Sequence, residues 1–231
     1  MKIYAVIPAR SGSKGLKNKN IKLINNKPLI SYSINHAKKL NFINRIFCST
    51  DSEKYAKIAV KYGAEVPFLR SHDASKDNSM EDEILKDLRK NFHLNNIEEP
   101  DLLVWLRPTF VFRSLKDIKV CTNKLISNPV FTSARIITQA ENRLYKIKKD
   151  YLKPNFNDGN KSMIRRQDLE PSYKVFNTDI IRFKKNDFND MFLGEKVFSV
   201  ISDPICGLDI DNKLDFEISK LLIENSPKFS K

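Results

Sequence analysis

The chain has 231 residues, enough to bury one sizeable core, and 41% hydrophobic with 30% charged residues is typical of a globular protein. It contains nothing close to the ~20 consecutive apolar residues of a membrane span, no signal-peptide pattern, and no cysteine spacing typical of a disulfide framework or zinc site, so we expect a cytoplasmic protein with no membrane partner. The formal charge of +13 allows a polyanionic partner, but the lysines are dispersed in a way that favours ordinary surface over nucleic-acid binding.

Strand and helix patterns alternate along the chain. Runs of apolar and β-branched residues predict strands or extended segments, which are 3–8, 45–50, 65–69, 101–106, 129–138, 196–201 and 205–209. Helical spacing of apolar residues predicts helices, which are 28–40, 52–62, 79–92, 114–126 and one from Asn212 onwards. The alternation predicts a single α/β domain over residues 1–231, with a doubly wound, mostly parallel sheet and ligands beyond the carboxyl ends of its strands.

Between about residues 139 and 172 this alternation breaks down. The segment is polar and contains Pro154, Gly159 and Pro171. It therefore predicts a protruding excursion within the domain, suited to contact a second subunit.

The turn after the first predicted strand is rich in small and basic residues and reads Ala9-Arg10-Ser11-Gly12-Ser13-Lys14-Gly15. Small residues let backbone N–H groups approach phosphate oxygens, and Arg10 and Lys14 add charge-assisted contacts to a triphosphate. The sequence matches neither the Walker loop nor the Gly-x-Gly-x-x-Gly fingerprint. The pattern indicates a phosphate-binding loop, and a flexible surface loop is the alternative.

A pair of carboxylates lies near the end of the chain, in Gly207-Leu208-Asp209-Ile210-Asp211. On a strand, residues two apart point to one face, so Asp209 and Asp211 can converge on one hard cation. This spacing predicts a magnesium site. The alternative is that Asp211 or Asn212 caps the last helix, with Asp215 in its first turn.

Residues 7–15, followed by Lys19-Asn20-Ile21, resemble the N-terminal signature of the acylneuraminate cytidylyltransferases, the CMP-sialic acid synthetases, with Ser11 where that family usually has glycine. Further segments resemble the family in the same order, and these are Ser49-Thr50-Asp51, Pro67-Phe68-Leu69-Arg70, Leu106-Arg107-Pro108-Thr109 and Arg113-Ser114. The resemblance implies a Rossmann-like nucleotidyltransferase that couples CTP to an acidic nonulosonic sugar, of the sialic, legionaminic or pseudaminic type. It also implies a homodimer in which the excursion reaches the partner's sugar pocket.

The resemblance implies roles for individual residues. Those implied to bind CTP are Ala9, Arg10, Ser13, Lys14, Asn20, Arg70 and Ser79. The catalytic residues implied are Arg10 and Lys14 on the phosphates, with Asp209 and Asp211 holding Mg²⁺.

The implied sugar pocket draws on a later segment. Residues 165–168, then Pro171, Tyr173 and Asn177, resemble the family's sugar-pocket stretch, with Thr178 in place of glycine. The residues implied to bind the sugar are Arg107, Arg166, Gln167, Tyr173 and Asn177. Arg166 is the candidate for the sugar carboxylate, because a guanidinium group offers a bidentate fork, although a solvated surface charge is the alternative.

Arg107 stands where the family usually has glutamine, which favours an extra acidic or hydrogen-bond-accepting substituent on the sugar. Activation of an octulosonic acid by CTP is therefore an alternative. An alternative of another class is a basic protein that binds nucleic acid or nucleotide without turnover.

Overall fold

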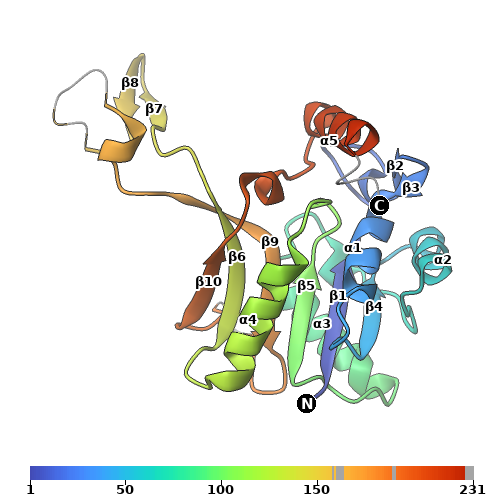
Figure 1. Cartoon of the computed structure of the whole chain (residues 1–231). Coiled ribbons are helices and arrows are strands. Elements are labelled where there is room, and N and C mark those ends of the chain that lie inside the picture. The colour runs from blue at the N-terminus through green and yellow to red at the C-terminus, as the bar shows by residue number, and fades with distance from the viewer. Residues whose placement is uncertain (158, 160–163, 189–190, 227–231) are drawn as a thin grey trace.

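A six-stranded sheet forms the centre of the molecule (Figure 1). The structure is a computed structural model that describes residues 1–157, 159, 164–188 and 191–226. Across the sheet the order is β10 (Val197–Ile201), β6 (Ser133–Gln139), β9 (Tyr173–Arg182), β5 (Leu102–Leu106), β1 (Ile3–Pro8) and β4 (Arg45–Ser49). Strand β1 is parallel to β4 and β5, and β10 is parallel to β6, whereas β9 is antiparallel to both of its neighbours. The expected α/β fold with a mostly parallel sheet is confirmed.

Helices cover both faces of this sheet, which is why the central strands are apolar without alternation. They are α1 (Leu29–Lys38), α2 (Glu53–Tyr62), α3 (Glu81–Leu94) and α4 (Leu115–Ser127), whereas the fifth helix, α5 (Lys213–Asn225), packs into a separate apolar cluster. Along β1, Ile3, Ala5 and Ile7 pack into a core with α1, α2 and α4. Tyr4 and Val6 point the other way, into a second core with α3. The predicted helices are thus present, each within about two residues of its expected bounds at the accuracy usual for helix ends.

A third apolar cluster fixes the C-terminal segment against the N-terminal half. Phe216 and Ile223 of α5 pack with Ile24, in the short hairpin β2 (Leu23–Ile24) and β3 (Lys27–Pro28), and with Ile210. The hairpin turns through Asn25 and Asn26, both at positive φ, a conformation that asparagine tolerates. This packing places residues 209–211 beside the first third of the chain.

The structure differs from the sequence-based expectations at three strands. Residues 65–69 make only an isolated bridge, Glu65 to Phe47, because Pro67 has no N–H with which to continue the pairing. Residues 204–207 form a 3-10 turn with Pro204 in its first turn and Asp203 as the cap, so the strand expected at 205–209 is wrong. Strand β9 was not predicted, although it lies in the middle of the sheet.

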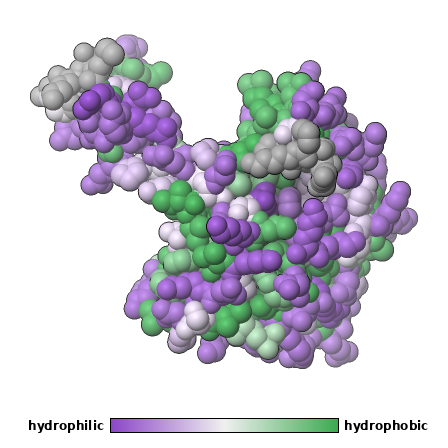
Figure 2. Space-filling model, viewed as in Figure 1, coloured by the Kyte–Doolittle hydropathy of each residue, from purple (hydrophilic) through white to green (hydrophobic). Residues whose placement is uncertain are grey.

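The expected excursion projects from the body as an arm (Figure 1). It carries the antiparallel hairpin of β7 (Tyr145–Lys148) and β8 (Tyr151–Pro154) and the short helix at Arg166–Asp168. Figure 2 shows the arm standing off from the body, hydrophilic over most of this face. None of the helices in the described part of the chain has the length and apolar character needed to cross a membrane.

Candidate active site

The loop after β1 is anchored at its start by the end of β4. Ala9 donates its N–H to the carbonyl of Ser49 at 2.8 Å, and Asp51 accepts from both the N–H and the hydroxyl of Ser11, each at 2.8 Å. The departure from glycine at position 11 therefore adds a side-chain hydrogen bond to the loop. The carboxylate of Asp51 holds the segment that leads into Gly12–Gly15.

The same loop ends against the C-terminal aspartates. A Cβ atom on Gly15 would lie 2.4 Å from the backbone carbonyl oxygen of Asp211, so only glycine fits this approach. Lys19 adds an ion pair, with its Nζ 3.0 Å from Oδ1 of Asp211 and a side chain only 14% exposed. Lys19 and Asp211 are 192 residues apart in sequence, so the two ends of the chain meet at this place.

These segments surround one open pocket of about 660 Å³ at the carboxyl ends of β1 and β5. Its lining includes, from the predicted set, Arg10, Ser13, Lys14, Asn20, Arg70, Arg107, Asp209 and Asp211. Among the residues without a predicted contact to ligand, the lining includes Gly15, Lys19, Glu81, Trp105, Thr109 and Phe176. The structure therefore brings the basic loop and the paired aspartates to a single site.

The two cations of the loop share one exposed carboxylate. Arg10 donates to Oδ1 of Asp77 at 2.9 Å and to the carbonyl of Lys76 at 2.9 Å, while Nζ of Lys14 lies 2.5 Å from Oδ2 of Asp77. The hydrogen bond from Lys14 lowers the pKa of Asp77. The Lys14 side chain is 79% exposed, so both cations present their charge to solvent and to the pocket.

Asp209 and Asp211 lie on an extended segment outside the sheet. Ile210 points into the core between them and its N–H donates to the carbonyl of Thr109 at 3.1 Å, so the two carboxylates still reach the same pocket. Burial raises the pKa of Asp209, and its Oδ1 is a buried atom with no hydrogen-bond partner among the described residues. The proximity of Thr109 opposes this rise in the pKa of Asp209, and the charge of Asp211 adds to it.

The N-terminal cap of α5, which was the alternative interpretation of this segment, is present next to Asp209 and Asp211. Asn212 accepts from the N–H of Asp215 at 3.0 Å, and the carboxylate of Asp215 accepts from the N–H groups of Asp211 and Asn212. The Asp211 side chain takes no part in this cap. The cap is therefore made by neighbouring residues, and the carboxylates of Asp209 and Asp211 both line the pocket, with that of Asp211 paired to Lys19.

The predicted nucleoside-binding residues divide into two groups. Asn20 is buried, lines the pocket, and donates to the carbonyl of Arg10 at 3.0 Å. Arg70 also lines it and donates to Ser49 at 2.7 and 3.0 Å, and burial lowers the pKa of Arg70 to about 10. Ala9 and Ser79 are not among the lining residues. Ser79 instead donates to the carbonyl of Asp73 at 2.6 Å.

Arg107 lines the pocket, but its donors are already engaged. They reach Oε1 of Glu81 at 2.9 Å, Oδ2 of Asp179 at 2.9 Å and the carbonyl of Phe176 at 2.8 Å. Asp179 is fully buried and also pairs with Arg135 at 2.5 Å. Arg107 is thus part of a closed ion-pair network, and in this conformation it offers no free fork to a substrate acid.

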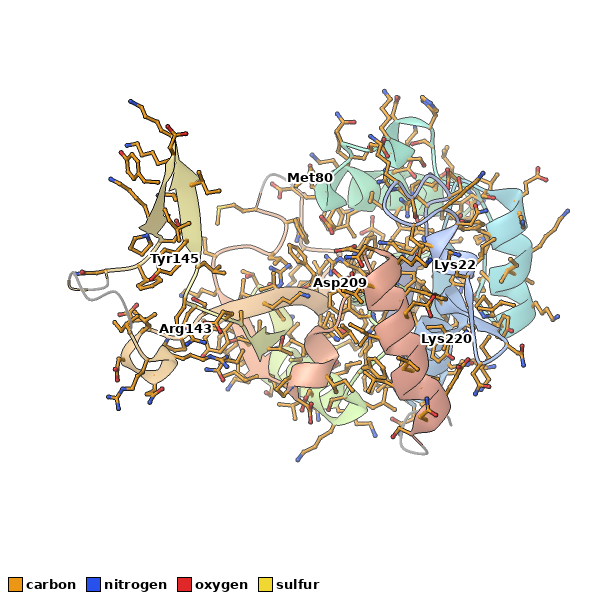
Figure 3. All side chains as sticks on the ribbon, turned by 90° about the horizontal axis from the view of Figure 1, so that it is seen from above. Lys22, Met80, Arg143, Tyr145, Asp209 and Lys220 are labelled. Atoms are coloured by element: carbon orange, nitrogen blue, oxygen red, sulfur yellow. The ribbon has the colours of Figure 1, made fainter. Side chains whose placement is uncertain are left out.

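The other predicted sugar-binding residues lie outside the pocket. Asn177 is buried and donates to the carbonyls of Phe112 and Cys206, a role in packing. Arg166 donates to the carbonyl of Ala140 at 3.0 Å, and Gln167 is exposed beside it. The arm that carries both is far from Asp209 in the view of Figure 3, which labels Arg143 and Tyr145 on the arm. Tyr173 is 40% exposed and starts β9 at the neck of the arm.

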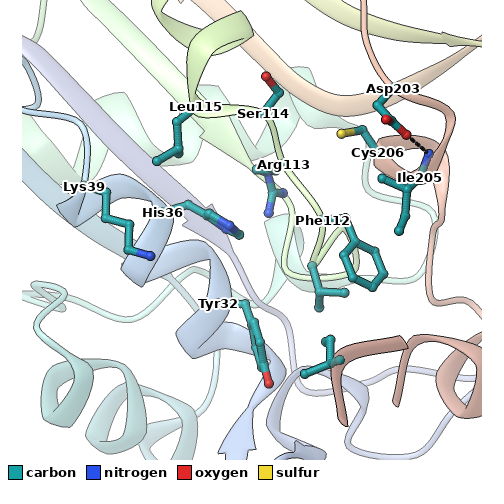
Figure 4. Close-up of a pocket in the computed structure, with 12 residues that line it drawn as sticks. Tyr32, His36, Lys39, Phe112, Arg113, Ser114, Leu115, Asp203, Ile205 and Cys206 are labelled. Carbon is teal, nitrogen blue, oxygen red and sulfur yellow. Dashed lines mark hydrogen bonds between the residues drawn. The ribbon is translucent and has the colours of Figure 1, made fainter. Parts of the chain in front are cut away.

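A second, more enclosed pocket of about 460 Å³ contains His36 and Arg113 (Figure 4). The donors of Arg113 are engaged by Ser33, Thr178 and three backbone carbonyls, those of Arg107, Phe110 and Asn177. Burial, followed by the charge of Arg113, lowers the pKa of His36 to about 3. Arg113 therefore ties the loop of residues 107–113 to α1 and β9, and this pocket offers no free anion-binding group from it.

Sequence reasoning missed four lining residues with evident roles in the geometry, which are Lys19, Glu81, Thr109 and Phe176. Lys19 and Thr109 lay within motifs that were recognised, so their position was a usable signal. Glu81 and Phe176 had none, because each reaches the pocket only through the packing of α3 and β9.

Comparison with known proteins shows which proteins this chain resembles. The family model described as cytidylyltransferase matches residues 4–190. The post-translational flagellin modification protein B of Campylobacter coli is 34% identical over 96% of this chain and 95% of its own length. The CMP-N,N'-diacetyllegionaminic acid synthase of Legionella pneumophila is 32% identical, with 97% of both chains covered.

A solved structure of a CMP:2-keto-3-deoxy-manno-octonic acid synthetase in complex with CTP superposes with a TM-score of 0.69, at 15% identity, and covers 97% of this chain and 99% of its own. At that identity the likeness concerns the fold.

Proposed function

The chain belongs to the cytidylyltransferase family, and we propose that it joins CTP to an acidic nonulosonic sugar, giving the CMP-sugar and pyrophosphate. The observation that carries this proposal is the meeting of the basic loop with Asp209 and Asp211 around one pocket, fixed by Gly15 against the carbonyl of Asp211. The relative from Legionella pneumophila, a CMP-N,N'-diacetyllegionaminic acid synthase that matches over 97% of both chains, supports the sugar class.

We propose that Asp209 and Asp211 hold Mg²⁺. The residues fit this ion, because both carboxylates reach the pocket and the buried Oδ1 of Asp209 has no hydrogen-bond partner within the part of the chain that the structure describes. Mg²⁺ commonly binds through one or two carboxylates, with phosphate oxygens and water completing the octahedron. When bound there, the ion would supply neutralisation of charge on the phosphates.

The protein groups in the pocket suit an in-line displacement. In the proposed reaction the anomeric hydroxyl of the sugar attacks the α-phosphorus of CTP and an O–P bond forms. The bond from the α-phosphorus to the bridging oxygen breaks, pyrophosphate leaves, and the hydroxyl proton passes to water. Arg10 and Lys14 would exchange Asp77 for the triphosphate, while Asn20 and Arg70 would contact the nucleoside. Positioning and charge neutralisation carry most of such a reaction, and no protein nucleophile is required.

The proposed assembly is a homodimer in which the arm serves the partner's site. Arg166 and Gln167 are exposed on an arm that stands away from the chain's own pocket. The hairpin also exposes apolar side chains, with Ile147 at 79% and Leu152 at 63%. Mixing Arg10→Ala with Arg166→Ala should partly restore activity if each site uses both chains, whereas self-contained sites would show no restoration.

We propose that the enzyme works in the cytoplasm. Cys48, Cys121 and Cys206 are all free and buried, as in proteins of a reducing compartment.

An assay of pyrophosphate release from CTP, with Mg²⁺ and a sugar acid present, tests the function directly. The acids to compare are N,N'-diacetyllegionaminic, pseudaminic, N-acetylneuraminic and 2-keto-3-deoxy-manno-octonic acid, the last being the octulosonic acid. We expect turnover with at least one nonulosonic acid and none without sugar. Turnover restricted to the octulosonic acid would overturn the sugar class, and tight nucleic-acid binding without any turnover would overturn the enzyme.

A further inference from the structure

Strand β9 contains a bulge that displaces one aromatic residue. Ile136 pairs with Thr178 and Thr138 with Lys174, so residues 175–177 lie opposite the single residue 137. Phe176, at the middle of the bulge, has φ +82. A bulky side chain at positive φ is an outlier that its surroundings must hold in place, and bulges of this kind re-aim side chains near functional sites.

Two arginines hold Phe176 in this conformation. Nη1 of Arg107 donates to its carbonyl at 2.8 Å, and the guanidinium carbons of Arg107 and Arg135 lie 5.0 and 5.2 Å from the ring centroid. Both guanidinium groups are fixed in turn by Asp179, which has no solvent exposure. The ring is thus positioned by a rigid charged network, which supports a role for the ring itself.

Phe176 lies on the β9 side of the pocket, away from the phosphate loop. We call this the acceptor side, because the sugar that would accept the nucleotide would bind there. Phe176 lines the pocket and remains 45% exposed. Strand β9 is separated from β1 by β5 alone, so at ~4.8 Å per strand it lies about 10 Å from the strand that carries the phosphate loop. That spacing suits a sugar placed beyond the triphosphate held by Arg10 and Lys14.

We propose that Phe176 is a specificity-determining residue whose ring forms the apolar wall for an N-acyl group of the acidic sugar. The inference rests on the proposed function and names the substituent that the pocket selects. A phenyl ring has no hydrogen-bond donor or acceptor beyond its π face, so an acyl methyl group packs against it, whereas a hydroxyl placed there loses hydrogen bonds to water. The wall thus favours acylated nonulosonic acids over their hydroxylated analogues.

The test compares kcat/KM, from pyrophosphate release with CTP, for three acids. N,N'-diacetyllegionaminic acid and N-acetylneuraminic acid carry acetamido groups, and ketodeoxynonulosonic acid carries hydroxyls instead. Phe176→Gly removes the ring and suits the positive φ, and Phe176→Leu keeps apolar bulk. We expect the preference for the acylated acids to fall about tenfold or more in Phe176→Gly, the range of apolar-pocket discrimination, and to fall less in Phe176→Leu.

Thermal unfolding separates this outcome from general damage. Phe176→Gly relieves the strained backbone but loses the contacts of the ring with Arg107 and Arg135, so its thermal midpoint should stay within about 4 °C of the wild type. Asn96→Gly is the matched control, since Asn96 is exposed at φ 54 and far from the pocket lining, and it should leave the preference unchanged. A preference in Phe176→Gly within about twofold of wild type overturns the inference and leaves the proposed function intact. Failure of the wild type to use any of the three acids or pseudaminic acid overturns both.

Discussion

The cations on the two sides of the pocket differ in the exposure of the carboxylates with which they pair. On the β1 side, Arg10 and Lys14 pair with Asp77, a carboxylate that is itself 44% exposed. On the β9 side, Arg107 and Arg135 close on Asp179, which is fully buried. The first pair of cations can exchange its partner for a ligand, and the second cannot without stranding a buried charge.

This difference separates ligand-binding cations from scaffold cations. An exposed ion pair contributes little to folding, so a triphosphate can displace Asp77 easily. Breaking a buried pair costs about 3–5 kcal/mol, which a substrate carboxylate must offset before it gains anything. A count of arginines around the pocket would therefore overstate how many of them bind the substrate.

The largest effect should come from removing a carboxylate on the phosphate side. We expect Asp209→Asn to lower kcat by on the order of 100-fold or more, since the charge stabilisation at stake amounts to several kcal/mol. The thermal midpoint should not fall, because burial disfavours the charged form of Asp209. Steady-state pyrophosphate release and calorimetry measure the two effects.

Asp215→Asn is the matched control for that variant. Asp215 caps α5 with its carboxylate and is not among the residues lining the pocket, so its loss should cost about 1 kcal/mol of stability and little activity. Equal loss of activity in both variants would mean that Asp209 acts through the local fold.

The phosphate side was largely predictable from sequence and the acceptor side was not. The loop of residues 9–15 and Asp209 with Asp211 follow recognisable local patterns, and the structure brings them to one pocket. The reasoning about Asp209 and Asp211 used the wrong element, since they lie on an extended segment rather than a strand. The alternation of side chains survives there because Ile210 is anchored in the core.

Strand β9 escaped prediction because its sequence imitates a loop. Its first residues are exposed, and its buried part carries Asn177, Thr178 and Asp179, polar groups satisfied mainly by long-range partners. Those partners, such as Arg107 and Arg135, lie far away in sequence. No local pattern encodes such a network, so neither Phe176 nor the closed state of Arg107 could be predicted.

Alanine substitutions at two glycines of the phosphate loop, Gly15 and Gly12, test how closely this loop must approach Asp211. Gly15→Ala places a Cβ atom 2.4 Å from the carbonyl oxygen of Asp211, and the backbone must move to relieve it. We expect activity to fall at least tenfold and stability by about 1–3 kcal/mol, as in other overpacked sites. Gly12→Ala meets no atom of the described residues within 4 Å and should unfold like the wild type. Unaltered activity in Gly15→Ala would show that the loop and Asp211 need not approach this closely.

A smaller effect should appear in acid, where His36 lies beside the scaffold cation Arg113. The pKa of His36 is lowered to about 3 by burial and then by the charge of Arg113, so the unfolded chain binds the proton more readily. Stability should therefore fall as the pH drops below about 6.5, by at most about 1.4 kcal/mol per pH unit. His36→Gln should flatten that dependence in urea titrations at pH 7, 6 and 5. An unchanged slope would show that His36 binds its proton equally well in the folded and the unfolded chain.

The smallest effect is expected from removing Asp77, the carboxylate that Arg10 and Lys14 would exchange for the triphosphate. Asp77 occupies Arg10 and Lys14 in the free protein, so CTP must displace it. Asp77→Asn removes the competing charge and should lower KM for CTP roughly two- to fivefold, the limit for exposed ion pairs, while kcat stays unchanged. The gain should shrink in high salt, because both the competitor and the triphosphate are screened. Asp73→Asn is the control, since Asp73 pairs with Lys76 instead. A higher KM in Asp77→Asn would mean that Asp77 holds the two cations in place for the phosphates, and the contrast between the two sides of the pocket would then be lost.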